Sequence, residues 1–182
     1  MTLTAAADGS ALGNPGPAGW GWYIDADRWD LGGWPHGTNN MGELTAVLDL
    51  LQQTAHLDED LHVICDSKYV INSITSWMPG WKAKGWRKKD GKPVLNLEIM
   101  QALDAAMAGR RVTFEWVKGH AGHPLNEEAD RLATTAAAAW AKGVAPERGP
   151  GIPGARSGTA EAVVEHAVQQ SEQEPDEPLS LF

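Results

Sequence analysis

Cysteine is nearly absent from this sequence, since Cys65 is the single one among 182 residues. One cysteine cannot form an internal disulfide, which excludes the disulfide-stapled secreted domains and favours a reducing compartment. Cys65 ends an apolar run, and we expect it to be a small core residue. The length predicts one domain that is large enough to bury a core without covalent staples.

Long apolar runs are also lacking. No stretch approaches the roughly 20 residues that a membrane-spanning helix needs, so we expect no membrane partner. The N-terminus has neither the basic start nor the apolar centre of a signal peptide. With 42% hydrophobic residues, the composition is typical of a soluble globular protein, and we expect a monomer in the cytoplasm.

Positive charge is scarce overall, and the formal net charge is −9. Such a surplus of acids at first argues against a nucleic-acid partner. The distribution argues the other way, because residues 143–182 hold seven acids and two arginines, whereas residues 77–92 hold six basic residues and one acid. The acidic C-terminal part therefore conceals a local basic patch of the kind that binds phosphates.

Composition and periodicity divide the chain in two. We predict a folded domain over 1–142 and a disordered tail over 143–182, where Gly-Pro punctuation gives way to Glu, Gln and Pro. Within the domain, the hydrophobic periods predict the element order β-β-β-α-β-α-α-β-α. The first three strands are expected to be antiparallel neighbours, and the fold class is α/β with a mixed sheet.

Four carboxylates occupy positions that are awkward for surface acids. Asp8 lies at or near the end of the first strand, Glu43 lies on the apolar side of a helix, Asp66 directly follows a buried strand, and Asp130 borders the apolar stripe of the last helix. Three have an ordinary explanation: a turn for Asp8, a structural salt bridge for Glu43 and an N-cap for Asp66. Asp130 is harder to explain in this way, because a carboxylate at the edge of a buried stripe needs a partner. Together the four acids would repel one another unless a cation joined them. Oxygen-rich clusters favour Mg²⁺ or Mn²⁺, and two such ions can bind the attacking and leaving oxygens of a phosphodiester.

Aromatic residues other than tryptophan are few, yet three tryptophans fall within the basic patch. Trp77, Trp81 and Trp86 interleave with lysine and arginine. Indoles can stack on sugars or bases while the cations neutralise phosphates. The alternative is that the indoles simply pack on a neighbouring helix, and both can hold at once.

Four motifs in unbroken order resemble those of type 1 ribonuclease H. They are Asp8-Gly9-Ser10, Asn39 to Leu44, Cys65 to Val70, and Gly119 to Gly122 followed by Asn126 to Asp130. The resemblance covers roughly residues 3–141 and includes the tryptophan-basic segment between the motifs. It implies the ribonuclease H-like fold, a five-stranded mixed sheet flanked by helices with a basic helical protrusion. It also implies an endonuclease that cuts the RNA strand of RNA–DNA hybrids with two Mg²⁺ ions, for which Mn²⁺ can substitute, leaving 3′-hydroxyl and 5′-phosphate ends.

The resemblance assigns roles by position. Asp8, Glu43, Asp66 and Asp130 match the metal-binding acids, and His120 matches a loop histidine linked to proton transfer and product release. His123 has no such match, and we expect it to cap or hydrate the loop. The residues that match contacts to the nucleic acid are Asn14, Thr38, Asn39, Asn40, Tyr69, Trp77, Trp81, Lys82, Lys84, Trp86, Arg87, Lys88, Lys89 and Asn96.

Two other classes of function stay open at this point. One is a different nuclease or integrase on the same fold, although those enzymes lack the basic protrusion and usually the histidine loop. The other is a non-catalytic module that binds hybrids or metals. The intact acids argue against a mere binder, because a binder has no reason to collect four mutually repelling carboxylates.

Overall fold

A five-stranded mixed sheet forms the centre of the molecule in the computed structural model, which describes residues 1–155, 160 and 163. The strands are β1 (Thr2–Ala11), β2 (Gly16–Asp25), β3 (Arg28–Gly37), β4 (Asp60–Cys65) and β5 (Val112–Trp116), in the order β3-β2-β1-β4-β5. β1, β2 and β3 pair antiparallel, whereas β4 pairs parallel with both β1 and β5. This confirms the predicted mixed sheet and its antiparallel meander.

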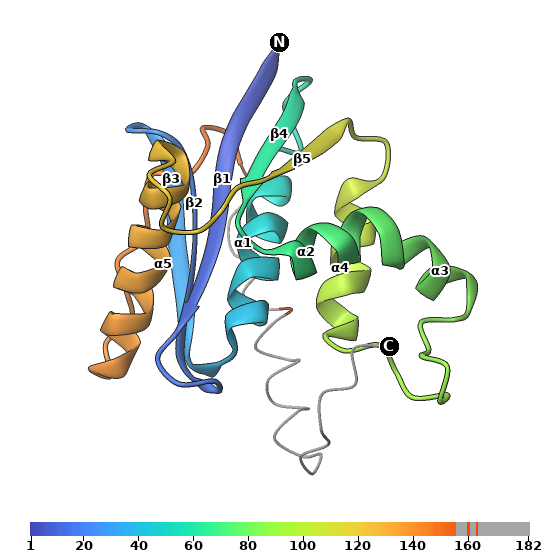
Figure 1. Ribbon diagram of the computed structural model, residues 1–182. Helices are drawn as coiled ribbons and strands as arrows, with labels where there is room; N and C mark the ends of the chain where they lie inside the picture. Colours follow the sequence, from blue (N-terminus) through green and yellow to red (C-terminus); the bar gives the residue numbers. More distant parts are fainter. Residues whose placement is uncertain (156–159, 161–162, 164–182) are drawn as a thin grey trace.

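Helices cover both faces of the sheet (Figure 1). One face carries α1 (Asn39–Gln53) and α4 (Leu97–Met107), which pack on each other, while α5 (Pro124–Ala141) lies alone on the other. α2 (Lys68–Asn72), a π-helical turn η1 (Ser73–Trp77) and α3 (Met78–Ala83) follow β4 and lead into the basic patch over residues 77–92, which we call the protrusion. None of the helices described has the length and apolar character needed to cross a membrane.

The sequence Gly19-Trp20-Gly21-Trp22 in β2 shows how the two faces differ. Successive side chains of a strand point to opposite faces, so both tryptophans enter the core beneath α1, where they are fully buried. Both glycines face α5, and a Cβ added to Gly19 would collide with the backbone oxygen of Ala133. The alanine-rich helix therefore lies directly on the strand, and this close approach positions its first turns.

Two elements differ from the sequence prediction. β1 continues to Ala11 rather than ending at or near Asp8, because residues 8–11 still pair with β2 after the pairing with β4 has ended. The run from Tyr69 to Trp77 is helical as predicted, but its second half, Ser73–Trp77, is a π turn that continues into α3.

The beginning of the predicted tail is held against the domain, in contrast to the disorder expected from residue 143. Arg148 forms a two-pronged ion pair with the buried Asp30, at 2.8 and 2.9 Å. The amide of the buried Ile152 donates to the Gln53 side chain at 3.0 Å. Composition could not reveal this docking, because it depends on one arginine meeting a buried acid. Most of the predicted tail after residue 155 lies outside the described residues.

Candidate active site

The register of β1 and β4 brings the first two acids together. The parallel ladder ends with Ala6 opposite Ile64, so two residues further along, Asp8 and Asp66 lie beside each other. β1 continues beyond this point as the partner of β2, whereas β4 ends at Cys65. The edge at which the parallel pairing stops thus presents two carboxylates.

Glu43 joins them from the first turns of α1 because the helix approaches the strand very closely. A Cβ on Gly9 would collide with the backbone nitrogen of Glu43, so only glycine fits beside Asp8. Carboxylate oxygens of Asp8, Glu43 and Asp66 lie within 4.8 Å of one another. We call these three residues the acid cluster.

Burial and mutual repulsion act strongly on the acid cluster. Asp8 is 3% exposed, and burial, followed by the charge of Asp66, raises its pKa to about 9 against the hydrogen bond from the Gly9 amide. Burial also raises the pKa of Glu43 to about 7, although a hydrogen bond from Ser67 favours the charged form. The cluster therefore holds protons at neutral pH that a bound cation would displace.

The donor set fits a divalent cation of the hard kind. It consists of carboxylate oxygens alone, which suit Mg²⁺ and Mn²⁺ rather than softer metals. The Cys65 thiol packs in the core and donates to the backbone oxygen of Ser67 at 3.8 Å, and burial raises its pKa, so it is the small core residue that the sequence predicted. The structure thus brings together three of the four acids that the sequence singled out.

Asp130 and the histidine loop border the cluster. Asp130 on α5 lies outside the tight group of three, yet close enough that its charge contributes to the raised pKa of Asp8. A Cβ on Gly119 would lie 2.9 Å from Asp66 Oδ2, which places the loop against that carboxylate. The next residue, His120, is exposed and has a φ of 57°. His123 caps α5, as its ring nitrogen accepts from the Asn126 amide at 3.4 Å.

The predicted nucleic-acid contacts form two groups in the fold. In the first, the Asn14 side chain accepts from the Asn39 amide at 3.2 Å, and Thr38 caps α1. In the second, Asn96 donates to the Tyr69 hydroxyl at 3.3 Å, and Tyr69 meets the Trp77 ring edge-on at 6.2 Å. This second group leads from the core into the basic protrusion.

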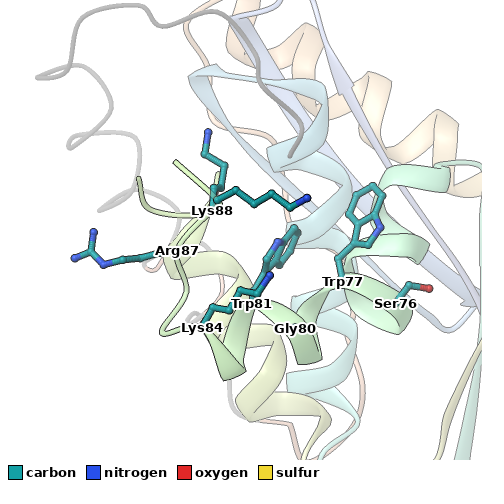
Figure 2. Close-up of a pocket in the computed structure, with 8 residues that line it drawn as sticks. Ser76, Trp77, Gly80, Trp81, Lys84, Arg87 and Lys88 are labelled. Carbon is teal, nitrogen blue, oxygen red and sulfur yellow. The ribbon is translucent and has the colours of Figure 1, made fainter. Parts of the chain in front are cut away.

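A hollow of about 270 Å³ lies on the protrusion. Figure 2 shows the indoles of Trp77 and Trp81 bordering it, with the guanidinium of Arg87 directed away from both. The ring centroids of Trp77 and Trp81 are 5.9 Å apart. Lys82 departs from the predicted pattern, since it forms an ion pair with Asp104 at 3.0 Å. Trp81 and Trp86 also pack on the core, which confirms the packing interpretation for these two indoles. The residues lining the hollow are Ser76, Trp77, Gly80, Trp81, Lys84, Arg87, Lys88 and Lys89.

Sequence reasoning missed three side chains around the cluster. Ser67 both caps α2, accepting from the Val70 amide at 3.2 Å, and supports Glu43. Trp116 donates to the backbone oxygen of Asp66, and the Lys68 ammonium lies over the Trp116 ring. Ser67 and Lys68 directly follow Asp66 in the chain, and this position next to a predicted site residue could have identified them. Nothing in the sequence indicated that Trp116 contacts this turn.

The fold and the acid cluster define a metal-dependent nuclease of the ribonuclease H-like class. The family described as RNase H matches residues 2–138. Ribonuclease H of Tropheryma whipplei is 54% identical over 149 residues, which are 82% of this chain and 92% of the relative. Ribonuclease H of Paracoccus denitrificans is 48% identical over 139 residues, covering 72% and 89%. The chain belongs to the ribonuclease H family.

Solved structures agree with this fold. LC9-RNase H1, described as a type 1 RNase H with the type 2 active-site motif, superposes with a TM-score of 0.68 at 28% identity, covering 98% of this chain and 88% of that one. The foamy viral protease–reverse transcriptase, solved in complex with an RNA/DNA hybrid, gives a TM-score of 0.66 at 18% identity over 74% of this chain and 20% of that one. At that identity the second likeness concerns the fold alone.

Proposed function

We propose that this protein is an endoribonuclease that hydrolyses the RNA strand of RNA–DNA hybrids with two divalent metal ions. The observation that carries the proposal is the convergence of the acid cluster within 4.8 Å at the edge of the parallel pairing. Membership of the ribonuclease H family supports the substrate. The proposed products carry 3′-hydroxyl and 5′-phosphate ends.

Each acid has a proposed task. Asp8, Glu43 and Asp66 hold the ions, and Asp130 completes the set from α5. Mg²⁺ is the proposed physiological ion, with Mn²⁺ able to replace it, and when bound the ions stabilise charge on the attacking and leaving oxygens. Glu43, which enters from α1, also senses the 2′-hydroxyl that distinguishes RNA from DNA.

His120 is the proposed proton carrier. His120 is exposed on a loop that Gly119 places against Asp66, so we propose that it reaches a leaving group near the cluster without belonging to it. A histidine can take up and release a proton near neutral pH. We therefore assign it proton transfer and product release rather than metal binding.

The predicted contacts are proposed to bind different parts of the duplex. Asn14, Asn39 and Asn40 are proposed to contact the minor groove, while Thr38 and Asn96 are proposed to grip a phosphate of the DNA strand. Phosphates of the DNA strand are proposed to meet the protrusion, where cations neutralise charge and indoles offer stacking surfaces. Lys82 contributes least, because Asp104 already neutralises it. Tyr69 and Trp77 are proposed to form the aromatic wall of the DNA channel. The proposed contacts on the protrusion are Trp81, Lys84, Trp86, Arg87, Lys88 and Lys89.

A substrate panel tests the proposal. Hybrid, double-stranded RNA and double-stranded DNA of one sequence are incubated with the protein, with Mg²⁺ and with a chelator. The proposal predicts cleavage of the hybrid alone, in its RNA strand alone, and only with Mg²⁺. Cutting of double-stranded DNA would indicate another nuclease of this fold, while binding to the hybrid without cleavage would indicate a non-catalytic module. The proposal further expects a monomer that works in the cytoplasm.

A further inference from the structure

Trp116 is an exposed aromatic residue beside the acid cluster with no part in the proposed chemistry. It ends β5 opposite Cys65. Its Nε1 donates a hydrogen bond to the backbone oxygen of Asp66 at 3.1 Å. The Lys68 ammonium lies over its ring, 4.5 Å from the centroid. One indole therefore holds both ends of the turn that leads from Asp66 to α2.

The exposure of Trp116 is unusual in this protein. It is 45% exposed, whereas the other eight tryptophans are buried or half-buried. An indole that served only to fill the core would hide more of its surface. The contacts that explain its place are those to the Asp66–Lys68 turn, so its position relates to the site rather than to packing.

Lys68 is held in a way that leaves its charge available. Its side chain is exposed, and no carboxylate among the described residues lies within ion-pair distance of its ammonium. A ring face attracts the cation but accepts none of its hydrogen bonds in full, so the N–H groups stay free for an anion. A lysine stem fixed on an indole also loses little further freedom when it binds.

We propose that Trp116 is a positioning residue for the Asp66–Lys68 turn. Its hydrogen bond fixes the backbone that carries Asp66, and its ring fixes the Lys68 ammonium as a contact for a phosphate of the hybrid next to the acid cluster. This inference rests on the proposed function, because it needs a polyanionic substrate at the cluster. It predicts that one side chain influences both turnover, through Asp66, and affinity, through Lys68.

Four variants separate the two contacts. Trp116→Phe keeps a ring beneath Lys68 but lacks the N–H, whereas Trp116→Leu loses both contacts. Lys68→Met removes the charge at similar length, and Lys68→Arg restores it. Lys142→Met, at the opposite end of α5 from Asp130, is the matched control for losing an exposed lysine. Steady-state cleavage of a hybrid in Mg²⁺ gives kcat and KM, and hybrid affinity in a chelator gives a readout that needs no metal.

The expected results differ in kind between the variants. Lys68→Met should raise KM and the dissociation constant about two- to tenfold with little change in kcat, and lower the salt slope by about one phosphate contact. Lys68→Arg should restore both. Trp116→Phe should lower kcat about two- to tenfold with KM near wild type. Trp116→Leu should show both defects, and adding Lys68→Met to it should raise KM no further.

Other outcomes would overturn the inference. Additive KM effects in the double variant would show that Lys68 acts independently of the indole. Wild-type kinetics in Trp116→Leu would show that the contacts are incidental. Thermal unfolding of each variant detects a folding defect, and Trp116→Phe then decides the hydrogen-bond part alone. Failure of the wild-type protein to cut hybrids would refute the proposed function instead, so the two failures are distinguishable.

Discussion

Replacing Asp8 by asparagine should make the metal-free protein more stable while abolishing cleavage. Asparagine keeps the shape of the protonated carboxyl and can still accept the Gly9 amide at its oxygen. It removes the charge that burial and Asp66 oppose. An active site that gathers like charges lowers the free energy of unfolding, so neutralising one of its carboxylates should raise that free energy.

The size of the effect follows from the pKa. Above the unfolded-state pKa of 3.8 the unfolded chain releases its Asp8 proton, while the folded protein retains it up to about pH 9. The unfolded state therefore binds fewer protons, and wild-type stability falls as pH rises through this window. At about 1.4 kcal/mol per pKa unit, moderated by relaxation of the site, we expect Asp8→Asn to gain about 2–5 kcal/mol at pH 8. That is about 5–15 °C in Tm.

Thermal unfolding in a chelator at pH 4.5 and pH 8 measures this gain. The increase in Tm should be small at pH 4.5 and large at pH 8. Millimolar Mg²⁺ should stabilise the wild-type protein but hardly affect the variant. Asp58→Asn, just before the start of β4 and so at the end away from Asp66, is an exposed control that should change little at either pH. A variant less stable than wild type at pH 8, or a gain independent of pH, would refute the reasoning.

Three further predictions concern other parts of the molecule. His120→Ala should slow turnover by about 10²-fold with Mn²⁺ affinity unchanged by calorimetry, and a loss of metal binding would make it a ligand. Joint alanine substitution of Arg87, Lys88 and Lys89 should raise KM and flatten its salt dependence more than it lowers kcat; an unchanged salt slope would exclude the protrusion from binding. Arg148→Met should lower the free energy of unfolding by about 2–3 kcal/mol, measured with a chemical denaturant, because it leaves the buried Asp30 without its cation. The value of kcat should not change. An unchanged free energy of unfolding would show that the docking is weak.

Much of the fold could be predicted because its elements are locally encoded. Alternation in β2 and the three-to-four spacing in α1 gave the right element types in the right order. The position of Glu43 on the apolar side of α1 also predicted that its carboxylate faces inward, as it does in the acid cluster. Its approach to Asp8 depends on Gly9, whose role is visible only once the helix lies on the strand.

What the sequence could not predict depends on contacts between distant residues. The docking of Arg148 on Asp30 joins positions 118 residues apart, and tail composition alone favoured disorder. Trp116 meets the Asp66 backbone only because β5 pairs with β4 in one particular register. Lys82 belongs to the basic patch by sequence, yet Asp104 on α4 neutralises it. Charge patterns thus locate a patch without deciding which of its cations are free.

Cleavage by the Asp66→Asn protein tests the central claim most directly. A hybrid with end-labelled RNA is incubated in Mg²⁺ with excess wild-type protein, with Asp66→Asn, and with the remote Asp58→Asn control. The account predicts that wild type and control cut the RNA strand at similar rates, whereas Asp66→Asn binds the hybrid but leaves it intact. Cleavage by Asp66→Asn at the wild-type rate would contradict the account, because the acid cluster would then not be the site of the chemistry.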